Sequence, residues 1–133
     1  MPGLGLGVGV ILINPAELRW TQLTAGGRER AQALRENLLM HGWDGPPIDV
    51  VQISEGLVTV DHTRAAVALE LDLGEIPTRV HLPEEPLPLD MIGRFKHPDG
   101  RIAHTWGEAI EFRAARQNPP LPPYGTTQIP RLP

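Results

Sequence analysis

Apolar runs and one helical repeat organise the first third of the chain. Residues 8–13 form an unbroken apolar run closed by Asn-Pro, and they predict a first strand that is buried on both faces. Residues 16–22 predict a connection or a single helical turn, with Trp20 as a packing residue. After two glycines, apolar residues at three- and four-residue spacing predict a helix over 28–41 that ends at Gly42. Its buried face is expected to contain Ala31, Leu34, Leu38 and His41.

The middle of the chain alternates strand and helix signals. Residues 48–53 and 57–60 are β-branched runs separated by Ser-Glu-Gly, and they predict a β-hairpin. After a short polar stretch, the composition changes at Ala65 to strong helix formers, which predicts a second helix. Residues 76–82 predict a fourth strand, with its proline near the start or on an edge. The hairpin therefore leads through the polar stretch directly into a helix.

The last third carries a strong helix start and a proline-rich end. Residues 89–95 predict one or two helical turns, and a Thr-Trp-Gly-Glu capping box predicts a helix over about 105–117. In this box the threonine side chain is expected to accept a hydrogen bond from the glutamate N–H, and the glutamate side chain one from the threonine N–H. Residues 119–133 contain six prolines, which predicts an extended tail that lies against the body. The expected anchors of this tail are Tyr124 and Ile129.

The order of elements predicts a fold class. Strand, helix, hairpin, helix, strand and further helices together indicate a small α+β domain, with helices packed on a mixed β-sheet. A chain of 133 residues is the size of a single domain. We expect residues 1–10 to be a linker or a cloning remnant, residues 11–118 to form the domain, and residues 119–133 to pack on it as a tail.

Composition narrows the chemistry. The chain has no cysteine, which excludes disulfides, thiolate catalysis and cysteine zinc sites. No apolar run approaches the roughly 20 residues of a membrane-spanning helix, so we expect no membrane insertion. The net charge of −4 disfavours tight nonspecific binding of nucleic acid over the whole surface. Of the twelve basic residues eleven are arginines, whose planar side chain is the better fork for phosphate.

The densest chemical cluster is the polar turn, Asp61 to Arg64, between the hairpin and the second helix. A helix start leaves backbone N–H groups unpaired, with the positive end of the helix dipole behind them, and so attracts phosphate. An acid, an imidazole and a guanidinium at such a place could act on a bound phosphate. The alternative is that Asp61 or Thr63 caps the helix and that Arg64 is a solvated side chain.

The residue types suggest roles for a phosphodiesterase. His62 would be the general base or acid, since its ordinary pKa is about 6.5. Arg64 would clamp the phosphate and stabilise its developing charge. Asp61 would orient the histidine or hold a divalent cation such as Mg²⁺. Further candidates for binding the substrate are Thr63, Asp49, Gln22 and Arg113.

The motifs around this turn resemble those of the ParB/sulfiredoxin-like superfamily. That pattern has a proline-led strand, a Gly-turn, a second strand, and an Asp-Gly-x-x-Arg-like motif at a helix start. Residues 47–51, 55–56 and 61–66 stand in those places. The usual glycine ahead of the arginine is Asp61 here, so the phosphate loop differs from that of partition proteins and sulfiredoxin. Sulfiredoxin chemistry is excluded because it requires a cysteine.

A narrower resemblance is to the ParB-like toxin domains of bacterial polymorphic toxins. These carry a helix ending in Gly-Trp, an Asp-Asn-x-Arg-type motif, a Thr-Trp-Gly-Glu-like helix and a Pro/Gly-rich end. The corresponding residues are Gly42-Trp43, Asp61 to Arg64, Thr105 to Glu108, and Tyr124-Gly125 onwards, with His62 in place of the asparagine. The resemblance implies a nuclease domain at the C-terminus of a larger secreted protein. It would act in the cytoplasm of a target cell and be neutralised by a cognate immunity protein.

Two other functions remain open at this point. The same pocket could bind a nucleotide, as an NTPase or a phosphoryl-transfer enzyme, and the acidic net charge favours this over nucleic acid. The chain could also be a non-catalytic binding module that uses its proline-rich end as an interaction ribbon.

Overall fold

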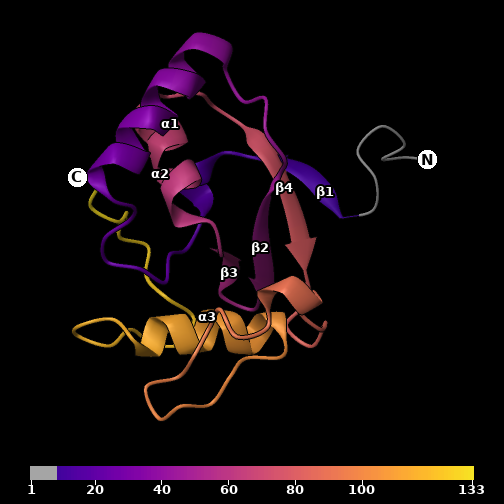
Figure 1. Cartoon of the computed structure of the whole chain (residues 1–133). Helices are drawn as coiled ribbons and strands as arrows, with labels where there is room; N and C mark the ends of the chain where they lie inside the picture. Colours follow the sequence, from indigo (N-terminus) through magenta and orange to yellow (C-terminus); the bar gives the residue numbers. More distant parts are fainter. Residues whose placement is uncertain (1–8) are drawn as a thin grey trace.

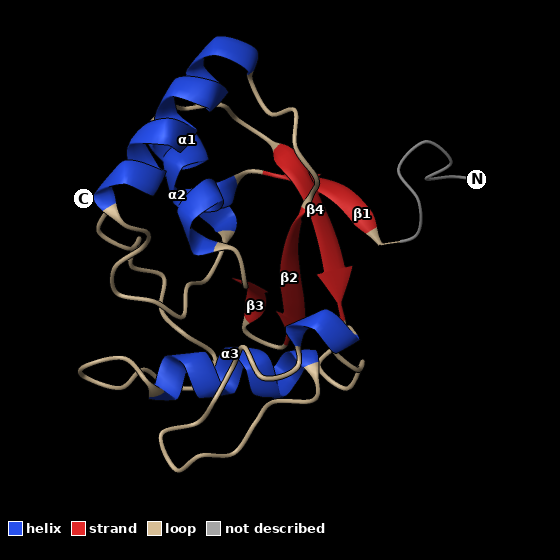
Figure 2. Cartoon of the chain, in the orientation of Figure 1, coloured by secondary structure: helices blue, strands red, loops and turns tan. Residues whose placement is uncertain are grey.

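The computed structural model describes residues 9–133 and arranges them as one mixed β-sheet covered by helices (Figures 1 and 2). None of the helices in this part of the chain is long and apolar enough to cross a membrane. In chain order the elements are β1 (Val10–Ile13), the 3-10 turn η1 (Pro15–Glu17), α1 (Arg28–His41), β2 (Ile48–Ile53), β3 (Gly56–Thr59), α2 (His62–Glu70), β4 (Ile76–His81), the 3-10 turn η2 (Leu89–Met91) and α3 (Trp106–Ala115).

The sheet has the strand order β1-β4-β2-β3. β2 and β3 form the predicted antiparallel hairpin, β2 and β4 are parallel with Val50 opposite Val80, and β1 runs antiparallel to β4. Both parallel and antiparallel pairs therefore occur, and the prediction of a small α+β fold with a mixed sheet is confirmed. β4 is a central strand, and it accommodates Pro77 as its second residue, near its start.

The first strand differs from the prediction. β1 is an edge strand that pairs only with β4 among the described elements, and Ile11 and Leu12 are 42% and 50% exposed. Burial on both faces was the wrong interpretation of this apolar run, because a short run of this kind also suits an edge position. Val8, which the predicted strand included, lies outside the described residues.

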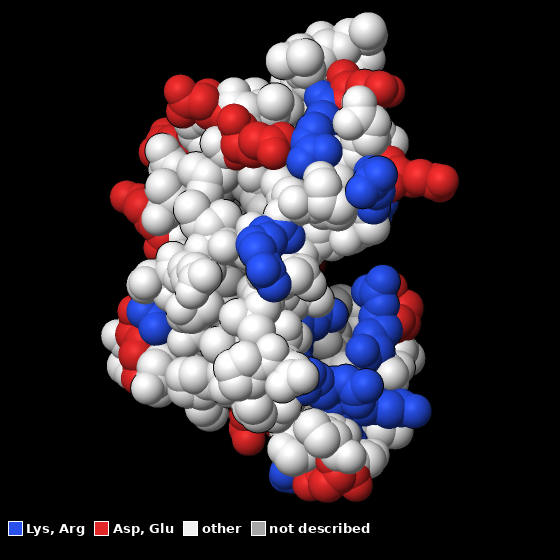
Figure 3. Space-filling model, turned by 90° about the vertical axis from the view of Figure 1, so that its left-hand side faces the viewer, with Lys and Arg blue, Asp and Glu red and all other residues white. Residues whose placement is uncertain are grey.

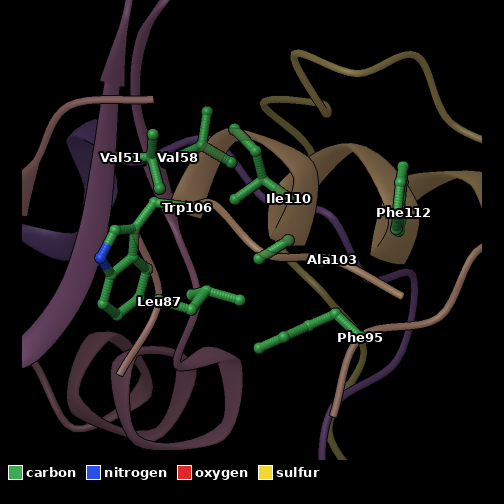
Figure 4. Packing of buried hydrophobic residues seen from close by; sticks show 9 residues of the cluster. Val51, Val58, Leu87, Phe95, Ala103, Trp106, Ile110 and Phe112 are labelled. Atoms are coloured by element: carbon green, nitrogen blue, oxygen red, sulfur yellow. The ribbon is translucent and has the colours of Figure 1, made fainter. Parts of the chain in front are cut away.

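Two hydrophobic clusters hold the layers together. One contains Val50 of β2, small side chains of α2 and Trp20, which is fully buried. The other contains Val51 of β2 and the apolar face of α3 with Trp106 (Figure 4). Successive residues of β2 thus belong to different clusters, as expected of a strand whose side chains alternate between two faces. α3 lies across the lower end of the sheet in Figure 1, whereas α1 and α2 lie side by side above it.

The helix predictions hold with two corrections. α1 has the predicted bounds and ends at Gly42, whose φ is 68°, but His41 is exposed rather than on the buried face. α2 begins three residues earlier than Ala65, because its cap is Asp61. α3 starts at the predicted box: Thr105 accepts a hydrogen bond from the Glu108 N–H at 3.1 Å. The Glu108 carboxylate accepts from the His104 N–H at 2.9 Å, one residue before the expected donor.

The proline-rich tail runs along the segment that follows η1. Trp20 and Thr126 exchange two backbone hydrogen bonds of 2.8 Å, and Arg131 forms two of 3.0 Å with Leu23 and Ala25. The predicted anchors Tyr124 and Ile129 are exposed, whereas Gly125 and Pro130 are buried. Backbone pairing therefore fixes the tail, with Leu132 packed against the cluster that contains Trp20. Gly125 is required because a Cβ there would lie 2.3 Å from the Trp20 carbonyl oxygen.

Candidate anion-binding site

The polar turn is built by hydrogen bonds that begin α2. Thr59 exchanges two hydrogen bonds of 3.1 Å with the backbone of Asp61, which fixes the end of the hairpin. Asp61 then accepts from the Arg64 N–H at 3.3 Å and caps the helix. The alternative interpretation, that an acidic residue of the turn caps the helix, describes what Asp61 does in the structure.

The Arg64 side chain is bound to the capping residue of α2 and to the loop before β2. Its Nε donates to the second carboxylate oxygen of Asp61 at 2.6 Å, and its Nη1 donates to the Pro46 carbonyl at 2.8 Å. The guanidinium also lies 5.1 Å from the ring centroid of Trp43. The expectation that Arg64 clamps a phosphate is therefore corrected: its side chain joins the polar turn to the loop before β2 through Asp61, Pro46 and Pro47.

His62 lies beneath the surface and is 2% exposed. Its Nε2 accepts a hydrogen bond from the Thr21 N–H at 2.9 Å, so in the neutral ring the proton is on Nδ1. Nδ1 has no hydrogen-bond partner among the described residues. The role of general base that the sequence suggested is a second correction, because the lone pair that would take a proton is bound to Thr21 inside the protein.

Burial also fixes the charge of this histidine. The pKa of His62 is lowered to about 3, first by loss of hydration and then by the nearby positive charge of Arg113, against a weaker opposite effect of the Val60 backbone. The ring is therefore neutral at physiological pH. Arg113 can approach it closely for that reason.

Three arginines surround a cleft beside the start of α2. The cleft has a volume of about 560 Å³ and is lined by Arg30 from the first turn of α1, Arg94 from the segment after η2, and Arg113 from α3. Figure 3 shows Lys and Arg side chains gathered around a hollow in this face. We refer to this hollow as the arginine cleft.

None of these three arginines lies within 4 Å of a carboxylate oxygen in the described part of the chain. Arg113 is half-buried, donates to the Val60 carbonyl at 2.9 Å and lies 4.5 Å from the centroid of Phe95. The pKa of Arg113 is lowered to about 10, mainly by burial and also by the like charge of Arg94, whereas Asp61 opposes the shift. An anion between Arg94 and Arg113 would relieve this repulsion.

A glycine brings the start of α1 close to the polar turn. Gly26 has a φ of 71°, and a Cβ at this position would lie 2.7 Å from the Thr63 Cγ2. Only glycine meets both conditions without strain. The close approach places Arg30 beside Thr63, whose hydroxyl accepts from the arginine Nη1 at 3.4 Å.

Asp49 of β2 supplies a carboxylate to the same cleft. Its Oδ1 is 2.8 Å from His81 Nε2, and the His81 ring stacks on Trp106 at a centroid distance of 3.8 Å. Arg79 lies 3.8 Å from the same oxygen. Because the histidine is fixed by stacking, it holds the carboxylate in one orientation.

No group of three or more His, Asp or Glu side chains in residues 9–133 is placed to hold a metal ion. Both carboxylate oxygens of Asp61, the residue expected to hold a divalent cation, bind Arg64 and the start of α2. In the structure, the Asp61 carboxylate therefore holds the polar turn and Arg64 together.

The structure gathers most of the predicted residues and adds others. Those that line the arginine cleft are Gln22, Asp49, Asp61, His62, Thr63 and Arg113. Arg64 does not line it. Arg30 and Arg94 do, although the sequence analysis did not single them out; the only signal was that an arginine-rich basic set suits phosphate.

The chain was compared with known proteins. No family model matches the sequence, and no curated protein matches it. The chain is similar in fold to a crystal structure of sulfiredoxin from Arabidopsis thaliana, with a TM-score of 0.47 and 15% sequence identity over 55% of this chain and 84% of that chain. The likeness concerns the arrangement of strands and helices alone. The resemblance to polymorphic-toxin domains comes from the sequence motifs alone and stays a prediction.

Proposed function

We propose that the protein is an enzyme that holds a phosphate group of a nucleic acid in the arginine cleft and hydrolyses a phosphodiester bond there. The observation that carries this proposal is the set of three arginines without carboxylate partners, placed beside the N-terminus of α2. Guanidinium groups and helix N-termini both favour phosphate. Arg94 and Arg113 would stabilise the negative charge that develops in the transition state.

The proposed base is Asp49 rather than His62. Asp49 would take a proton from a water molecule whose oxygen forms the new bond to phosphorus. The ester bond to the leaving oxygen breaks in the same step, and solvent protonates that oxygen. His81 is a positioning residue, since it contacts the carboxylate and is itself fixed on Trp106.

The sequence motifs support a biological setting for this activity. The domain would be the C-terminal toxin of a larger secreted bacterial protein, would act in the cytoplasm of a target cell, and would be neutralised by an immunity protein. Expression in a bacterial cytoplasm should then arrest growth, and the product of a neighbouring gene should restore it. Normal growth at high expression would contradict the toxin assignment.

A second candidate is hydrolysis of a nucleotide, or transfer of its phosphoryl group, in the same cleft. Two observations favour it: the volume of about 560 Å³ is that of a small-molecule site, and the net charge of the chain is −4. Release of phosphate from labelled nucleotides, without cleavage of labelled DNA or RNA, would select this candidate.

The test of both candidates is the variant Asp49→Asn. Loss of the base should reduce hydrolysis by roughly 100-fold or more, with an unchanged circular dichroism spectrum. The matched control is Glu70→Gln, which removes an equal charge from a carboxylate that pairs with Arg35 outside the cleft. Equal activity of Asp49→Asn and the control would rule out Asp49 as the base.

A further inference from the structure

A second hollow adjoins the arginine cleft and shares one wall with it. Its volume is about 350 Å³, and Gln22, Arg94, Phe95 and Arg113 line both hollows. The second hollow continues to Lys96 and to Arg116. The basic surface is therefore longer than a site for one phosphate group requires.

The side of the second hollow that follows η2 is built by an alternating segment. Phe95 is buried in the cluster that contains α3, whereas Arg94 and Lys96 on either side of it are exposed. Arg94 lies at a bend and Lys96 pairs with Ile102, and both residues line the second hollow. Burial of Phe95 thus turns both cations outward together.

The opposite side of this hollow is one face of α3. Arg113 lies in the last turn of α3, and Arg116, the C-cap residue three positions later, keeps a helical backbone, so both side chains line the same hollow. Arg116 Nη1 donates to the Lys96 carbonyl at 3.5 Å, which joins the two sides. No Asp or Glu lines the second hollow among the described residues, and neither Lys96 nor Arg116 lies within 4 Å of a carboxylate there.

We propose that the two hollows form one continuous phosphate track that binds a single-stranded nucleic acid. One phosphate would lie at the start of α2, the next between Arg94 and Arg113, and a further one between Lys96 and Arg116. This inference rests on the proposed function, because it takes the first hollow as the reaction site. It extends that function by naming a polymer, rather than a free nucleotide, as the substrate.

The geometry favours one strand over a duplex. Arg113 is half-buried and engaged with the Val60 carbonyl, so only a backbone that bends into the recess can reach it. A single strand bends in this way, and basic grooves are a common means of following its backbone. The one aromatic side chain of the track, Phe95, is buried, so bases have no ring to stack on and strands of different sequence should bind alike.

The experiment compares thymidine monophosphate, a ten-nucleotide thymidine oligonucleotide and its duplex with an adenosine strand. Binding is followed by fluorescence anisotropy over a range of salt concentrations, and strand integrity is verified on a gel. The wild-type protein should bind the single strand more tightly than either other probe. In Lys96→Gln/Arg116→Gln, affinity for the strand should fall roughly tenfold, and the slope of log affinity against log salt should become shallower by about 1.4.

The matched control is Arg28→Gln/Arg131→Gln, which removes the same charge from residues that line neither hollow. It should retain the affinity and the salt dependence of the wild type. The proposal of a continuous track is wrong if the mononucleotide binds as tightly as the strand, or if the two double variants behave alike. Either result would leave the proposed phosphate site in the arginine cleft intact. Tighter binding of the duplex would also overturn the track. If no probe binds and inorganic phosphate has no effect on the protein, the proposed function fails as well.

Discussion

The polar turn separates two groups of arginine side chains that have opposite surroundings. On one side, Arg64 has a carboxylate, two backbone carbonyls and the Trp43 ring for partners. On the other side, Arg94 and Arg113 face each other without a carboxylate within 4 Å in the described residues. An arginine bound to a carboxylate and to backbone carbonyls stabilises the fold, whereas neighbouring arginines without a counter-charge leave room for an anion.

The largest expected effect concerns His62, which lines the cleft with Arg94 and Arg113. Its pKa is about 3 in the folded protein against 6.5 as a free side chain, so the unfolded state binds more protons between these values. The free energy of unfolding should therefore be highest above pH 6.5 and should fall by roughly 1.4 kcal/mol per pH unit as the pH is lowered toward 3. Urea unfolding at several pH values measures this slope.

The matched variant is His62→Gln, which can still accept the Thr21 N–H but does not titrate. Its stability should depend less on pH over the same range. If both proteins lose stability in parallel on acidification, the histidine is not neutral in the fold, and the explanation for its closeness to Arg113 is wrong.

The next prediction compares Arg94 and Arg113 with Arg64 in their contribution to ligand affinity. Arg113→Gln and Arg94→Gln should each weaken binding of a phosphate-containing ligand by roughly 10- to 100-fold, since each removes a charged hydrogen-bond donor from the proposed contact. Arg64→Gln removes a charge of the same sign a short distance away and should have little effect on affinity. Isothermal titration calorimetry on all three variants tests the contrast, and equal losses would show that the cleft acts only through its overall charge.

The smallest expected effect is on stability, and it reverses the order of Arg64→Gln and Arg94→Gln. Arg64→Gln should lower the free energy of unfolding by about 1–2 kcal/mol, because it breaks the bonds to Asp61 and Pro46. Arg94→Gln should leave stability nearly unchanged or raise it, since a repelled charge is removed. Chemical denaturation near neutral pH measures both. If Arg64→Gln has the same free energy of unfolding as the wild type, the contacts of Arg64 do not stabilise the fold.

Local sequence signals were sufficient for most of the fold. The apolar spacing of 28–41, the hairpin around Gly56 and the capping box at Thr105 each depend on residues close in the chain, and each element formed as predicted. β1 was misjudged because its exposure is decided by its place at the edge of the sheet. That place depends on pairing with β4, which is distant in sequence.

The site was predictable only in part, for a related reason. The polar turn marked the correct helix start, but the direction of Arg64 depends on the Pro46 carbonyl and the Trp43 ring. The burial of His62 likewise depends on Thr21. Arg30 and Arg94 carry no local motif, and they reach the cleft only because α1 and the segment before α3 fold toward the same helix start.

The pairing of Trp20 with Thr126 has a consequence for how the protein reaches its native state. Thr21, the next residue, donates its N–H to the His62 ring and so fixes it. This wall of the cleft therefore depends on a β-bridge between residues that are far apart in the sequence. Contacts of such long range form late, after the entropy of closing a large loop has been overcome. Helices and hairpin can therefore assemble while the cleft is still unformed, and the capacity to bind phosphate should appear only in the final stage of folding.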